Sequence, residues 1–107
     1  MITTQHFFNN LDRLSKNDKF KDDDFFIMNI SQELIDIYMD HFEGKVFDCI
    51  YFFHLIIKNN TKSIITLTAR LCIDIINLKV GIKLKDEQKQ KESVNNINKI
   101  LLDFNNL

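Results

Sequence analysis

Four carboxylates recur at steps of three and four residues in one stretch of the chain: Glu33, Asp36, Asp40 and Glu43. On an α-helix this spacing places all four on one face, and neither Lys nor Arg interrupts the row. A solvated outer face of an amphipathic helix explains such a row. Like charges four residues apart also repel each other by a few tenths of a kcal/mol, which a basic partner would relieve. The row is therefore a candidate docking surface.

A second acidic group, Asp22, Asp23 and Asp24, stands directly before an apolar segment. A carboxylate in this place caps a helix, but only one of the three can be the cap. The surplus charge adds to the negative field of the row that follows. We call these seven residues the acidic surface and predict that they bind a partner: Asp22, Asp23, Asp24, Glu33, Asp36, Asp40 and Glu43.

The charges of the whole chain divide unevenly around Asp48. Ten of the fifteen acidic residues lie at or before this position, and nine of the fourteen Lys and Arg residues lie after it. The front half thus carries a charge near −5 (5 bases minus 10 acids) and the back half near +4 (9 bases minus 5 acids), within a net charge of −1. A negative field of this kind speeds the encounter with a basic protein.

Catalytic and metal-binding patterns are missing from the sequence. The chain has no GxSxG motif, no glycine-rich phosphate loop and no nucleophile framed by a base. The three histidines are scattered, and His41, beside Asp40, has no second donor four residues away. His54 stands in an apolar run, so we expect a hydrogen-bonded core histidine there. We predict no enzymatic activity, no metal and no cofactor.

Five lysines, at positions 79, 83, 85, 89 and 91, form a lysine band that raises the question of nucleic-acid binding. The band holds no Arg and no aromatic residue for base stacking, and three acidic residues dilute it: Asp86, Glu87 and Glu92. A solvated face explains the band better than a nucleic-acid interface.

Cys49 and Cys72 match no zinc or CxxC spacing, so we expect two buried thiols that act as small apolar residues; the sequence leaves open whether they lie close together. The N-terminus lacks the pattern of a signal peptide. The apolar stretches 46–57 and 64–78 are too short or too charged to cross a bilayer. We expect a cytoplasmic protein with no membrane partner.

The chain is expected to form a single domain over residues 1–107, and its lack of proline and its two glycines favour helices over strands. A first helix begins after Thr3 or Thr4, and a charged loop spans Ser15–Asp24. A helix over 31–43 starts with Ser31 as N-cap and ends before Gly44. Whether the run from Asp24 joins that helix stays open.

Residues 45–58 are apolar almost all round, which leaves a buried helix or a buried strand open, and residues 61–84 fit both a helical and an alternating strand pattern. On a helix, Arg70 and Asp74 would share a polar stripe as an i, i+4 pair. A hairpin would have to reverse around Ile75–Asn77, which contains no glycine, so helices are favoured. Lys85–Phe104 is helical. The fold class expected is all-α, a compact bundle of about five helices; the alternative is α+β, with helices packed on an antiparallel meander formed by residues 45–85.

These features together predict a non-enzymatic protein-binding module. The most concrete version is a small immunity or antitoxin-type inhibitor that docks its acidic surface onto a basic partner such as a toxin nuclease. One alternative is a small nucleic-acid-associated regulator that uses the lysine band at 79–91. Another is a homo-oligomer, a helical structural protein whose oppositely charged halves attract each other.

Overall fold

The computed structural model describes residues 3–15, 22–60 and 62–107, and in them the chain forms five helices and no strand. The helices are α1 (Thr4–Leu14), α2 (Asp24–His41), α3 (Val46–Asn59), α4 (Ser63–Lys83) and α5 (Glu87–Asn105). This confirms the all-α bundle of about five helices. The antiparallel meander over 45–85 is wrong, because that region folds as α3 and α4.

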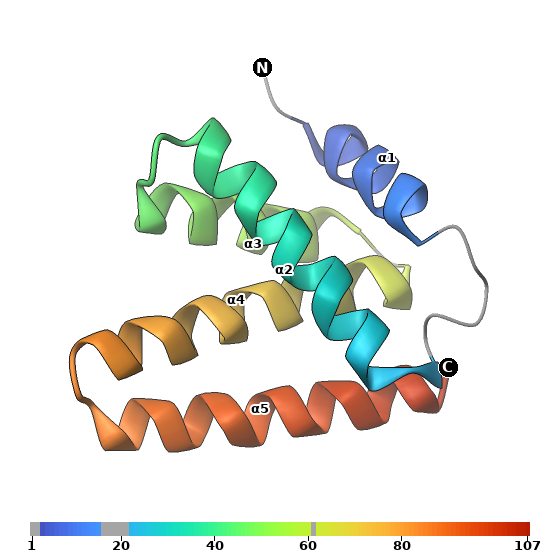
Figure 1. Ribbon diagram of the computed structural model, residues 1–107. Helices are drawn as coiled ribbons and strands as arrows, with labels where there is room; N and C mark the ends of the chain where they lie inside the picture. Colours follow the sequence, from blue (N-terminus) through green and yellow to red (C-terminus); the bar gives the residue numbers. More distant parts are fainter. Residues whose placement is uncertain (1–2, 16–21, 61) are drawn as a thin grey trace.

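Helix α4 lies at the centre of the fold and packs against α2, α3 and α5 (Figure 1). It forms an antiparallel pair with α5, while α1 packs on α2 and α3. The approach of α5 is close at Gly81: a Cβ added to this residue would lie 3.3 Å from the backbone nitrogen of Gln90. A Cβ here would therefore require the start of α5 to shift by a few tenths of an ångström around Gln90.

Helix α2 is longer than the sequence predicted at its N-terminus. Asp23 is its N-cap, with a side-chain oxygen that accepts a hydrogen bond from the backbone nitrogen of Phe26 at 3.2 Å. Ser31, predicted as the cap, lies inside the helix and is fully buried. The prediction failed because the apolar face begins one turn earlier, at Ile27, and the acidic group before it already supplies a cap.

The end of α2 lies close to the predicted one. The helix stops at His41, and Glu43 and Gly44 adopt φ angles of 55° and 76°. The Gly44 nitrogen donates to the Met39 carbonyl at 2.8 Å, which closes the last turn. Gly44 is thus the left-handed residue expected after the helix. Glu43, however, belongs to this turn and not to the helix.

Aromatic side chains from α1, α2 and α3 meet at the buried Tyr38. Its hydroxyl lies 2.9 Å from His6 Nδ1 and accepts a hydrogen bond from Asn10 Nδ2 at 3.3 Å. Burial raises the pKa of Tyr38 to about 12. These contacts join the polar side chains of His6 and Asn10 on α1 to the core. Thr3 caps α1, as predicted.

Cys49 and Cys72 are free thiols and both are buried, as expected. Burial raises the pKa of Cys49 to about 11 and that of Cys72 still further. The Cys72 thiol lies 3.6 Å from the carbonyl oxygen of Ser31, where α4 crosses α2. Both cysteines therefore serve as small core residues.

The predicted charged loop falls largely on residues 16–21, which lie outside the described residues, so that prediction stays untested. Among the residues that are described, no helix combines the length and the apolar character that a bilayer crossing requires.

Candidate functional site

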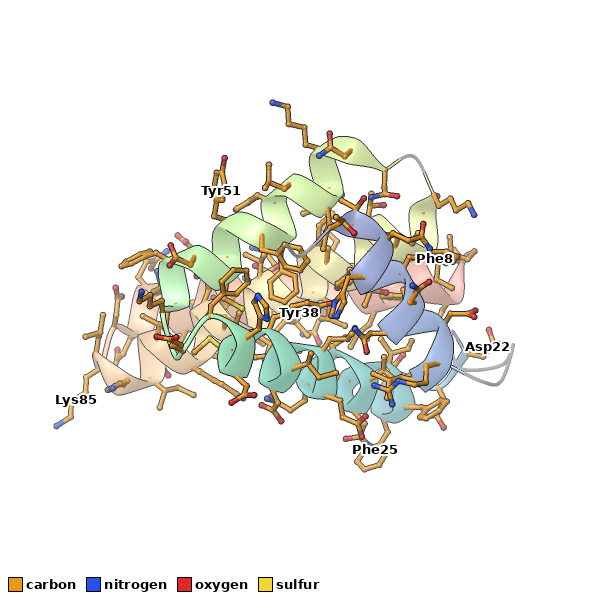
Figure 2. All side chains as sticks on the ribbon, turned by 90° about the horizontal axis from the view of Figure 1, so that it is seen from above. Phe8, Asp22, Phe25, Tyr38, Tyr51 and Lys85 are labelled. Atoms are coloured by element: carbon orange, nitrogen blue, oxygen red, sulfur yellow. The ribbon has the colours of Figure 1, made fainter. Side chains whose placement is uncertain are left out.

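All seven residues of the acidic surface are exposed. Asp22, Asp23 and Asp24 lie at the start of α2, where Figure 2 labels the first of them. Glu33, Asp36 and Asp40 follow on the outer face of the same helix, and Glu43 comes just after its end. The structure thus places the carboxylates along the length of one helix and at its two ends.

Three of these carboxylates also hold the fold together. Asp23 caps α2, and Asp24 Oδ1 accepts a hydrogen bond from Asn105 Nδ2 of α5 at 3.1 Å. Asp36 Oδ1 accepts one from Gln32 Nε2 at 2.9 Å. All three residues are nevertheless exposed.

Neutralisation from within would remove the negative field of the acidic surface. Across residues 3–15, 22–60 and 62–107, none of the seven carboxylates forms an ion pair with a Lys or Arg side chain. Lys79 of α4 does reach α2, but there it donates to Oε1 of Gln32. No Lys or Arg side chain of the described residues therefore neutralises the acidic surface.

An exposed aromatic side chain, which the sequence analysis did not single out, adjoins the acidic surface. Phe25 is 76% exposed, and Figure 2 shows it pointing away from the body of the protein. Asp36 lies eleven residues after Phe25, about three full turns, so the helical repeat places both on one face of α2. The exposure of Phe25 could have been predicted from the start of the helix. When α2 begins at Asp24, Phe25 lies on the face opposite the buried Ile27 and Leu34.

A groove of about 340 Å³ lies beside the acidic surface, where α2, the start of α3 and the end of α4 meet. Its apolar lining consists of Ile35, Met39, Val46, Ile76 and Val80. Asp36 stands at its edge on α2, and Lys79 and Lys83 stand at its edge on α4. Two lysines of the lysine band thus lie closer to the acidic surface than the division of charge along the sequence implied.

A larger cleft of about 490 Å³ lies between α3, α4 and α5. Polar and charged side chains from all three helices face it: His54, Arg70, Asp74, Asn96, Lys99 and Asp103. The exposure of His54 in this cleft contradicts the expected core histidine. The prediction failed because α3, although its sequence is apolar nearly all round, buries only one side, around Cys49, Phe53 and Ile56.

The carboxyl group of Asp74 is half-buried in this cleft. Partial burial raises its pKa, and the hydrogen bond that it accepts from Asn96 Nδ2 at 3.3 Å works in the opposite direction. Arg70 faces the same cleft from the preceding helical turn, as the predicted polar stripe required. The hydrogen-bond partner of Asp74 is nevertheless Asn96 of α5, so this carboxyl group links two helices.

The lysine band extends from the end of α4 to the first turns of α5. Its members are exposed except for Lys89, which is half-buried. Lys85, in the turn between the helices, lies at the opposite end of the protein from Asp22 (Figure 2). The length of the protein therefore separates Asp22 from Lys85, which stands at the centre of the lysine band.

Within the described part of the chain, no group of three His, Cys, Asp or Glu side chains could hold a metal ion. The chemistry on offer at the acidic surface is charge, hydrogen bonding and apolar contact. No protein-family model, curated protein or solved structure matches the chain.

Proposed function

We propose that this chain is a non-enzymatic protein-binding module that docks its acidic surface onto a basic partner protein. The observation that carries the proposal is the exposure of all seven carboxylates without an internal ion pair among the described residues. A basic partner would relieve the repulsion between these like charges. The field of the row would also steer the partner towards α2.

The exposed aromatic side chain of Phe25 is a second observation that supports the proposal. Charged pairs at the edge of an interface set the rate and the specificity of association, whereas buried aromatic side chains supply much of the affinity. Phe25 stands among Asp22, Asp23 and Asp24 with most of its ring in solvent. On binding, the ring would lose this exposure inside a rim of carboxylates.

The concrete form of the proposal is an inhibitor of the immunity or antitoxin type, directed at a toxin nuclease. Nucleases present basic clefts that bind phosphate, and a row of carboxylates on one rigid helix can occupy such a cleft. Helix α2 suits this role because its inner face is fixed in the core by Leu34, Ile35 and Tyr38. Little ordering would be needed on binding.

The test compares two triple charge reversals. The first variant carries Glu33→Lys, Asp36→Lys and Asp40→Lys within the acidic surface. The matched control carries Asp12→Lys, Glu92→Lys and Asp103→Lys at exposed positions outside it. Both variants change the net charge equally, so only the location of the change differs.

Each protein is co-expressed with the product of the neighbouring reading frame, and the affinity of the purified pair is measured by calorimetry at several salt concentrations. We expect the acidic-surface variant to lose about a hundredfold or more in affinity, and the control to keep the partner. For a nuclease partner, only the control would still inhibit cleavage of nucleic acid. Equal affinity and equal salt dependence in the two variants would disprove acidic docking.

A further inference from the structure

The groove beside α2 has an apolar floor and an excess of positive charge. Five apolar side chains from three helices line it, and its volume of about 340 Å³ falls within the usual range for ligand pockets, about 300–1,000 Å³. Lys79 and Lys83 face it against a single carboxylate, Asp36. Within the described residues neither lysine forms an ion pair, and Lys79 donates instead to Gln32, which is neutral. The groove therefore suits an apolar side chain that has negative charge beside it.

The chain itself carries a segment of this kind at the start of α2. Phe25 is 76% exposed, and Figure 2 shows its ring pointing away from the body of the protein. Three exposed carboxylates stand directly before it, those of Asp22, Asp23 and Asp24. A ring of this size contributes much of the energy of an interface when it becomes buried. The ring thus matches the apolar floor of the groove, and the carboxylates match its lysines.

The position of Phe25 along α2 allows two copies of the chain to exchange this contact. Phe25 and Asp36 share one face of the helix, and at 1.5 Å per residue they lie about 16 Å apart along its axis. When the α2 helices of two copies lie antiparallel, a two-fold axis midway between these positions brings each Phe25 to the groove of the other copy. Asn29 and Gln32 lie near the middle of this face, and both are uncharged. The crossing point therefore brings no like charges together.

We propose that the chain forms a symmetric dimer in which Phe25 of each copy occupies the groove of the other, with its neighbouring carboxylates beside Lys79 and Lys83. Asp36 repels these carboxylates, but the two lysines outnumber it. The dimer goes beyond the function proposed above and does not depend on it, because no other protein takes part. Since the dimer covers Phe25 and the carboxylates before it, a basic partner would compete with the second copy for them.

The first measurement is the mass of the purified full chain, determined by sedimentation from about 1 µM to about 1 mM. We expect the mass to rise from that of a monomer to that of a dimer and no further, because a reciprocal contact is closed. Added salt should weaken the dimer, since it screens the contact between carboxylates and lysines. A monomer at every concentration would overturn the proposal, and so would a mass that grows beyond the dimer.

The role of the ring is tested with Phe25→Ser. The variant should raise the dissociation constant of the dimer about a hundredfold, because each dimer loses two buried rings. The control is Tyr51→Ser on α3, an aromatic side chain that is 65% exposed and lies on the other side of the protein in Figure 2. If Phe25→Ser does not fold, as judged by circular dichroism, Phe25→Gln replaces it. An unchanged dissociation constant in the folded variant, or an equal loss in the control, would contradict the proposal.

The groove is tested with the double reversal Lys79→Glu and Lys83→Glu. Its control, Lys91→Glu with Lys99→Glu, changes the net charge equally at exposed positions of α5. Only the first double variant should lose the dimer. A similar loss in both would assign the effect to net charge and remove the groove from the interface.

Mixing the groove variant with Phe25→Ser tests whether ring and groove meet each other. Neither variant alone has an intact contact, but a mixed dimer has one, in which Phe25 of the groove variant enters the unaltered groove of the other chain. We expect the mixture to associate about tenfold more tightly than either variant alone. A mixture that associates no more tightly would show that the ring and the groove do not form one contact, which would overturn the proposal.

Discussion

The groove and the cleft are both hollows against α4, yet their linings differ in kind. The groove, of about 340 Å³, is lined by five apolar side chains together with Gln32, Asp36, Lys79 and Lys83. The cleft, of about 490 Å³, is faced by charged groups of both signs, and one of them, Asp74, already has a hydrogen-bond partner in Asn96. The smaller hollow is thus the less polar one.

This difference indicates which hollow suits a protein partner. Covering the cleft would remove water from several charged groups, which costs free energy unless each one finds a new partner. Covering the groove would remove water mainly from apolar atoms, which is favourable. Volume alone would have pointed to the cleft, whereas the chemistry of the lining points to the groove.

The largest effect is expected at the floor of the groove. Ile76 is only 4% exposed and belongs to the core as well as to the groove. Ile76→Ala should lower the free energy of unfolding by about 2–4 kcal/mol, because it leaves a cavity. The control Val80→Ala, at a half-buried wall, should cost about 1 kcal/mol or less. Urea denaturation measures both, and equal costs would mean that floor and wall are not packed differently.

A smaller effect with a clear pH dependence is expected in the cleft. The folded state raises the pKa of Asp74, so it holds the proton more tightly than the unfolded chain does. The free energy of unfolding therefore falls as the pH rises from 3.8, the ordinary pKa of this carboxyl group, through its raised pKa in the folded state. Asp74→Asn should thus stabilise the protein at pH 7, and this gain should vanish below about pH 4.

Thermal unfolding of the Asp74→Asn variant at a series of pH values tests this expectation, with the exposed Asp103→Asn as the control in the same cleft. Destabilisation at pH 7 would show that the Asp74 charge gains more from Arg70 and Lys99 than it loses by burial. The cleft would then be a stabilising charge cluster, and the contrast with the groove would sharpen.

A weaker effect is expected at the edge of the groove, where Lys79 and Gln32 meet on the surface. A double-mutant cycle with Lys79→Ala and Gln32→Ala should give a coupling energy of about 0.5 kcal/mol, since exposed polar contacts contribute little. Coupling well above 1 kcal/mol, measured by urea denaturation, would mean that this bridge governs the shape of the groove.

The smallest effect is expected at His54. The side chain is exposed at the cleft, so His54→Ala should change the free energy of unfolding by less than about 0.5 kcal/mol. The comparison is with Phe53→Ala on the buried side of α3, which should cost about 3 kcal/mol or more. A loss of similar size at both positions in chemical denaturation would restore the core histidine expected from the sequence.

The sequence by itself determined most of the helices and much of the acidic surface, because both depend on local spacing. Steps of three and four residues placed Glu33, Asp36 and Asp40 on one helical face, and the left-handed preference of glycine placed the turn at Gly44. The lack of a glycine around Ile75–Asn77, where a hairpin would have to reverse, was sufficient to favour a helix. Capping and periodicity act within a few residues, so a single chain reveals them.

Only the tertiary structure decided which side of an apolar run faces solvent. Helix α3 is apolar nearly all round, and contact with α1, α2 and α4 buries Phe53 while Phe47 is left 87% exposed. The groove joins side chains from Gln32 to Lys83, and the cleft joins His54 to Asp103. Both hollows are absent from any local pattern, because a concave surface exists only after helices distant in sequence have packed together.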